Sequence, residues 1–165
     1  MTGKKDGATR RSEAFLAQRR FARASALQYL YQADQQDEWS ISQRALDLFY
    51  DQIRESGNCP DSPEDLRRAW DYARRLIEGV IERRSDLDGA IETHALNWRL
   101  ARMSRIDRNI MRIAAFELLY RDDIPDATAI NESLELAKQY GDKDSARFVN
   151  GILDKLLKAH RETTE

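Results

Sequence analysis

Arginine residues gather in the first part of the chain, where their side chains could bind the phosphate groups of a nucleic acid. Residues 1–23 hold seven lysines and arginines against two acidic residues, so this segment has a formal charge of +5 and the remainder −7. Guanidinium groups donate paired hydrogen bonds to phosphates and stack on bases. A basic segment on an acidic body predicts a local polyanion-binding site. Its members are Lys4, Lys5, Arg10, Arg11, Arg19, Arg20 and Arg23.

The spacing of three of these arginines favours a shared helix face. Arg19, Arg20 and Arg23 fall within about 100° of arc at the helical angle per residue. They come just ahead of an apolar stripe, so we expect them to project from the end of a helical bundle. The alternative interpretation is a solvated basic face that binds nothing.

A basic residue also stands beside an aromatic one in the last third of the chain. Arg147 and Phe148 lie near the start of a predicted helix, where they could hold a phosphate and stack on a base of single-stranded RNA. The alternative is that Phe148 packs into the core. Asp144, just before them, is either at the edge of this site or an N-cap. Gly151 lies inside the same helix, where we expect close helix packing.

These side chains need a helical framework, and the composition predicts one. Only 7 glycines and 3 prolines occur in 165 residues, and runs of β-branched residues are absent. The pattern predicts an all-α fold of about seven helices in two packed bundles. We expect one compact domain over residues 12–160, preceded by a flexible basic arm over residues 1–11.

Helix boundaries follow from caps and breakers. The first two predicted helices cover about residues 12–35 and 41–55, and a third starts at Ser62-Pro63. A fourth runs from Ser85 or Asp86 to about Leu96, and a fifth starts at the capping box Ser104–Asp107. The sixth covers about 128–140 and ends before Gly141, and the last starts at Ser145.

Catalysis finds little support in the residue pattern. The two histidines are far apart, and Cys59 is the only cysteine, so no cluster has metal-ligand spacing. No glycine-rich phosphate loop occurs. We therefore predict a protein that is not an enzyme and uses no cofactor or metal. The longest apolar runs are too short to span a membrane, so we expect a cytoplasmic location.

Two phrases of the last third are the most distinctive part of the chain. They are Ala129-Ile130-Asn131-Glu132 and Arg147-Phe148-Val149-Asn150-Gly151. The first predicted helix adds Arg19-Arg20-x-x-Arg23, followed by Ala26-Leu27-Gln28-x-Leu30-Tyr31. Together these segments resemble the NusB family of bacterial transcription antitermination factors.

The resemblance implies a NusB-like fold and a function in binding. It implies that the arginine-rich helix and the Arg147-Phe148 stretch border an RNA surface, with Asp144 at its edge. It also places Tyr31 and Asp107 on the surface that binds NusE, a ribosomal protein of the small subunit, although Asp107 is equally well explained as the capping-box acid. The implied heterodimer binds single-stranded boxA RNA and joins RNA polymerase and other Nus factors, which favours processive transcription of ribosomal RNA operons.

Two alternatives stay open from the sequence. The first is a non-catalytic helical RNA-binding or adaptor module in ribosome biogenesis, related to the N-terminal domain of some rRNA cytosine methyltransferases. The second is a structural adaptor or homodimer whose basic end binds no RNA.

Overall fold

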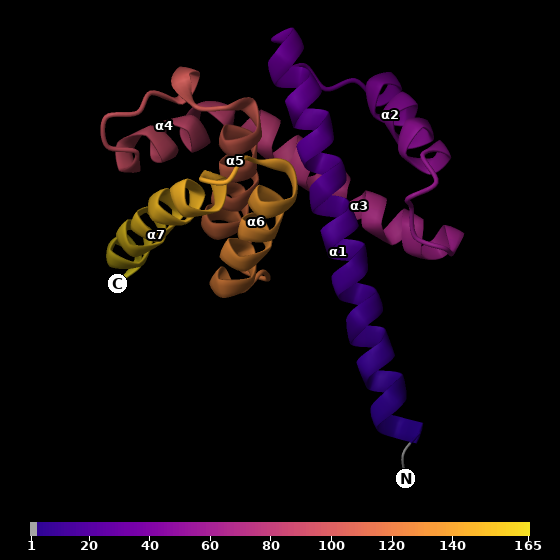
Figure 1. The fold of residues 1–165 in the computed structure, drawn as a ribbon. Coiled ribbons are helices and arrows are strands. Elements are labelled where there is room, and N and C mark those ends of the chain that lie inside the picture. Colours follow the sequence, from indigo (N-terminus) through magenta and orange to yellow (C-terminus); the bar gives the residue numbers. More distant parts are fainter. Residues whose placement is uncertain (1–2) are drawn as a thin grey trace.

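Helices make up the computed structural model, which describes residues 3–165 (Figure 1). No strand occurs in that range, so the predicted all-α class is confirmed. The helices are α1 Gly3–Gln36, α2 Gln43–Glu55, α3 Pro63–Glu82, α4 Arg84–His94, the short 3₁₀ helix η1 Leu100–Arg102, α5 Arg105–Tyr120, α6 Asp126–Tyr140 and α7 Ser145–Thr164.

The helices form two groups that share α5. In the first group α1 packs along α3, and α2 packs on α3. In the second group α5 contacts α4, α6 and α7, and it also contacts α1 and α3 of the first group. Figure 1 shows this separation, with α4 to α7 on one side of α1 and α2 on the other. The predicted arrangement of two packed bundles is confirmed.

The first helix begins earlier than expected. We predicted a start near residue 12, but α1 begins at Gly3, so that boundary is wrong. Residues 4–18 contain no proline and many good helix formers, which lets the helix continue away from the body. Its first turns extend beyond the other helices (Figure 1). Mobility of this basic arm stays a prediction, and the side chains of Lys4 and Lys5 lie outside the described part of the chain.

Serine caps begin two of the helices as predicted. Ser62 Oγ accepts a hydrogen bond of 3.0 Å from the Asp65 N–H, with Pro63 at the first helical position. Ser104 Oγ likewise accepts one of 3.0 Å from the Asp107 N–H. The predicted cap at Ser85 or Asp86 is wrong, because α4 follows α3 after a single residue and has no side-chain cap.

A buried polar network joins α1 to α4 and α5. The Asp34 carboxylate of α1 accepts hydrogen bonds from Arg108, from Asn109 at 2.9 Å and from Arg112 at 3.0 Å, all on α5. Arg112 also donates to Asp88 of α4 at 2.7 Å. Burial by itself raises the pKa of Asp34, but the hydrogen bonds from Arg108 and Asn109 outweigh it and hold the pKa below its ordinary value.

This network predicts a loss of stability in acid. Because the pKa of Asp34 is lower in the folded state, its contribution is complete above the unfolded-state pKa of about 4 and disappears as the pH falls through the folded-state pKa. We expect the urea midpoint to fall as the pH drops below about 4. The Asp34→Asn variant is less stable at neutral pH and has a shallower acid slope. An unchanged acid slope in that variant contradicts this assignment.

No helix among the described residues is both long and apolar enough to cross a membrane.

Candidate nucleic-acid interface

The three neighbouring arginines of α1 point into three different surroundings. Arg19 extends over α3, where its guanidinium lies 3.6 Å from the ring centroid of Tyr72. Arg20 faces α6 and forms an ion pair of 2.9 Å with Glu132, while just over half of its side chain stays exposed. Arg23 is only 2% exposed. The expectation that all three project from the end of a helical bundle is therefore wrong for Arg23.

Arg23 belongs to a buried ion pair that joins three helices. Its Nε and Nη2 donate to the Glu117 carboxylate of α5 at 2.9 and 2.8 Å. The Tyr72 hydroxyl of α3 donates to the same carboxylate. Burial by itself lowers the pKa of Arg23, but the hydrogen bonds that Arg23 donates to Glu117 outweigh this effect and raise the pKa of Arg23 above its ordinary value. Arg23 thus positions α1 against α3 and α5, and in this conformation it has no free face for RNA.

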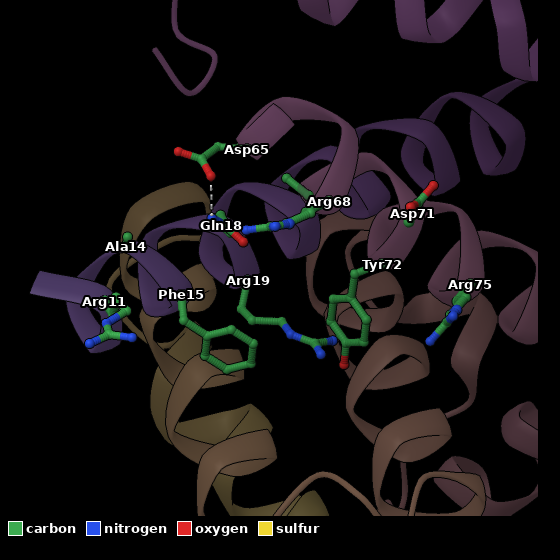
Figure 2. A pocket seen from close by; sticks show the side chains of 11 residues that line it. Arg11, Ala14, Phe15, Gln18, Arg19, Asp65, Arg68, Asp71, Tyr72 and Arg75 are labelled. Atoms are coloured by element: carbon green, nitrogen blue, oxygen red, sulfur yellow. Dashed lines mark hydrogen bonds between the residues drawn. The ribbon is translucent and has the colours of Figure 1, made fainter. Parts of the chain in front are cut away.

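A groove of about 530 Å³ runs between α1 and α3 (Figure 2). Arg19 crosses it between two aromatic rings, with its guanidinium 4.9 Å from the Phe15 centroid on one side and over Tyr72 on the other. Figure 2 shows Arg11 at one end and Arg75 at the other. Two predicted RNA-binding residues, Arg11 and Arg19, therefore share one basic and aromatic groove.

Arg10 lies on the exposed part of α1 that extends beyond the body. Like Arg11, it is exposed. Arg20 lies on the α6 side of α1, away from Arg19, because consecutive helical positions are turned by about 100°. The predicted basic patch is thus divided between two faces of one helix.

The Arg147-Phe148 stretch forms a separate site with a residue that the sequence analysis missed. Phe148 is half-buried and packs edge to face on Trp98, with the ring centroids 5.8 Å apart. Trp98 is 51% exposed. Asn97 precedes it with a φ of +68°, a left-handed conformation that asparagine tolerates. In the sequence, an aromatic residue directly after an asparagine that favours loops was the signal that could have indicated Trp98 as a site residue.

The surface of α7 beside this aromatic pair is open. Gly151 lies one turn after Phe148, and a Cβ atom at this position would meet no atom within 4 Å outside its own stretch of helix. The expected close packing at Gly151 is therefore wrong, and a ligand can approach the helix backbone. Arg147 is exposed on the same helix. Asp144 occupies the N-cap position of α7, but its side chain makes no cap hydrogen bond.

Tyr31 and the start of α5 line a second groove, of about 410 Å³. Its apolar walls include Leu27, Ile106 and Tyr140, and Tyr140 is 45% exposed. Asp107 is adjacent in sequence but is buried, and its Oδ1 has no hydrogen-bond partner in the described structure. Burial at the capped start of α5 favours a role in that helix, and contact of Asp107 with a partner protein stays a prediction.

Comparisons with known proteins agree on one family. The family model described as "NusB family" matches residues 20–158. Transcription antitermination protein NusB of Myxococcus xanthus is 43% identical over 141 residues, covering 86% of this chain and 95% of that protein. The NusB protein of Trichlorobacter lovleyi is 46% identical over 119 residues, covering 68% of this chain and 84% of its own length.

Two solved structures have the same fold. The structure of T. maritima NusB is 34% identical, with a TM-score of 0.69, and the match covers 88% of this chain and 96% of that one. A crystal structure of the antitermination factors NusB and NusE in complex with double-stranded RNA has a chain that is 25% identical with a TM-score of 0.69. That match covers 87% of this chain and 98% of the other.

Proposed function

This chain belongs to the NusB family, and we propose that it is a transcription antitermination factor that binds boxA-type single-stranded RNA together with NusE. The observation that carries the proposal is the family match over residues 20–158, which includes Arg20 and Arg23 of α1 and the Arg147-Phe148 stretch. The function is binding without catalysis. In the cytoplasm, the RNA-bound pair would join RNA polymerase and other Nus factors and promote processive transcription of ribosomal RNA operons.

The geometry supports two kinds of contact with RNA. Exposed guanidinium groups at Arg10, Arg11, Arg20 and Arg147 can bind phosphates, which makes the affinity dependent on salt. The aromatic pair of Phe148 and Trp98 can stack on a base that is not paired with another strand. Arg23 contributes by holding α1 in place, and Asp144 lies at the edge of the α7 surface.

The groove at Tyr31 fits the role of the NusE surface. It combines apolar walls with the hydroxyls of Tyr31 and Tyr140 and the side chains of Gln28, Gln32 and Gln35. Half-exposed aromatic residues with polar ends are typical of protein interfaces. The acidic body of the chain, with a formal charge of −7 beyond residue 23, is complementary to a basic ribosomal protein.

Replacing Tyr31 by aspartate tests this surface. The Tyr31→Asp variant places a carboxylate against Leu27 and Ile106, where NusE binding would remove it from water. We expect the Kd for NusE to rise by about tenfold, or about 1.4 kcal/mol, in calorimetric titrations. The circular dichroism spectrum should stay that of the parent, because Tyr31 is only half-buried.

The matched control is Tyr50→Asp, on α2 and away from the Tyr31 groove. We expect this variant to bind NusE like the parent protein. A Tyr31→Asp variant that also binds NusE normally contradicts the assignment of the groove. If the same substitution instead dissociates a homodimer in sizing experiments, the groove is covered by a second copy of this chain.

A further inference from the structure

We propose that the groove between α1 and α3 is a second RNA subsite, which holds nucleotides flanking the element bound at Arg20, Arg147 and Phe148. This inference rests on the proposed function, because it extends the path of the same RNA. It adds Phe15, Arg68 and Arg75 to the RNA-binding residues. The ligand is a single-stranded RNA segment bound by its phosphates and by base stacking.

The charge of the groove favours a polyanion. Four arginines line it, against the two aspartates Asp65 and Asp71. Asp65 is already engaged, because it accepts a hydrogen bond of 2.9 Å from Gln18 (Figure 2). The arginines come from two helices that face each other, which places positive charge on both walls of one channel. Phosphate groups are the ligand that such an arrangement binds most strongly.

The arginines of α3 are available to a ligand. Arg75 is exposed and has no hydrogen bond or ion pair within the described structure. Arg68 pairs with Glu64 at 2.8 Å, but both side chains are more than 60% exposed. A surface pair of this kind contributes about 0–1 kcal/mol, so a phosphate can replace the Glu64 carboxylate at little cost.

Phe15 supplies a stacking surface on the opposite wall. This large apolar side chain is 56% exposed. One side of its ring is occupied by the Arg19 guanidinium at 4.9 Å, as Figure 2 shows. An aromatic ring that is backed by a cation and open to solvent resembles the stacking positions of proteins that bind single-stranded nucleic acids.

The division of Arg19 and Arg20 between two faces of α1 makes a continuous path possible. Arg20 lies on the α6 side, and Arg19 lies in the α1–α3 groove. A strand that crosses α1 meets both arginines in succession. The RNA bound by this protein should therefore be longer than the segment that contacts Arg20, Arg147 and Phe148 alone.

A pair of matched double variants tests this subsite. Arg68→Gln with Arg75→Gln removes both groove arginines of α3. Arg67→Gln with Arg74→Gln removes two arginines of the same helix, with the same spacing, that do not line the groove. Arg74 also bonds to Glu78 and to Gln43 of α2, so the control tests whether a loss of contacts on α3 by itself weakens RNA binding. In the presence of NusE, we would measure anisotropy of a boxA-like core RNA and of the same core with oligouridine added at the 5′ end, the 3′ end or both.

We expect the parent protein and the control variant to bind an extended RNA more tightly than the core. The groove variant should bind the core normally, lose the gain from extension and show a slope of log K against log salt that is smaller by about 1.4 for the extended RNA. Phe15→Ala should also reduce the fluorescence change of 2-aminopurine placed in the extension.

Three results overturn the subsite. They are no gain from extension in the parent protein, equal losses for core and extended RNA in the groove variant, and a loss of NusE binding in that variant. Failure of the core RNA to bind the parent protein with NusE contradicts the proposed function itself. The two failures are therefore distinguished by the core RNA alone.

Discussion

The Arg23→Ala variant is expected to lose about 3–5 kcal/mol of its free energy of unfolding, because the substitution leaves the buried Glu117 carboxylate without its cationic partner. Arg23 and Glu117 are 2% and 1% exposed, so water cannot replace the lost hydrogen bonds. The total free energy of unfolding of a protein is about 5–15 kcal/mol. The melting temperature of the variant should therefore fall by roughly 10 °C. Urea unfolding followed by circular dichroism measures the change.

The control for this prediction is Arg20→Ala. Arg20 is 54% exposed, so water can reach the Glu132 carboxylate that the substitution leaves behind, and its loss should cost less stability than the loss of Arg23. The two variants separate positioning from binding: Arg23→Ala should act on stability, and Arg20→Ala on RNA affinity. A fully stable Arg23→Ala variant that binds RNA poorly contradicts the positioning role.

The second large effect concerns RNA affinity. Trp98→Ala is expected to weaken binding of single-stranded RNA by about 1–3 kcal/mol, or roughly 5- to 150-fold, because it removes the exposed half of the aromatic pair with Phe148. The tryptophan is 51% exposed, so its loss should leave the core intact. Anisotropy titrations of labelled RNA at constant salt measure the effect.

Leu96→Ala is the matched control, since Leu96 is an exposed apolar residue of the same loop and forms no aromatic pair. We expect this variant to bind RNA like the parent protein. If Trp98→Ala and Leu96→Ala bind RNA equally well, the stacking site lies elsewhere.

Much of the fold could be predicted because its signals are local. Ser62 with Pro63 and the N-cap Ser104 each act within one helical turn, and both helices begin at the predicted places. Ile110, Ile113 and Ala114 of α5 recur at helical spacing, and all three are at most 1% exposed. Local patterns of this kind need no knowledge of the partner helices.

The role of Arg23 could not be predicted from its residue type, because Glu117, the acidic residue that pairs with it, lies 94 residues away in the sequence. Its position did carry a signal. Arg23 precedes Ala26, Leu27 and Leu30 by three, four and seven residues, so it continues the apolar stripe toward the core. Spacing therefore indicated burial where the charge suggested exposure.

The helix α2 was predicted over about residues 41–55, but its packing partners were not, and it completes the first group of helices. Phe49 of α2 packs edge to face on Tyr29 of α1, with ring centroids 5.2 Å apart, and lies 6.0 Å from the ring of Trp70 on α3. These contacts join residues that are 20 or more positions apart, and aromatic side chains alone do not reveal their partners. The structure was needed to place them.

Binding of RNA with and without NusE tests the central proposal most directly. We would titrate a labelled boxA-like single-stranded RNA and a scrambled RNA of equal length at two salt concentrations, following fluorescence anisotropy. We predict tighter, sequence-selective and salt-sensitive binding when NusE is present. Equal affinity for the two RNAs, both with and without NusE, would contradict it.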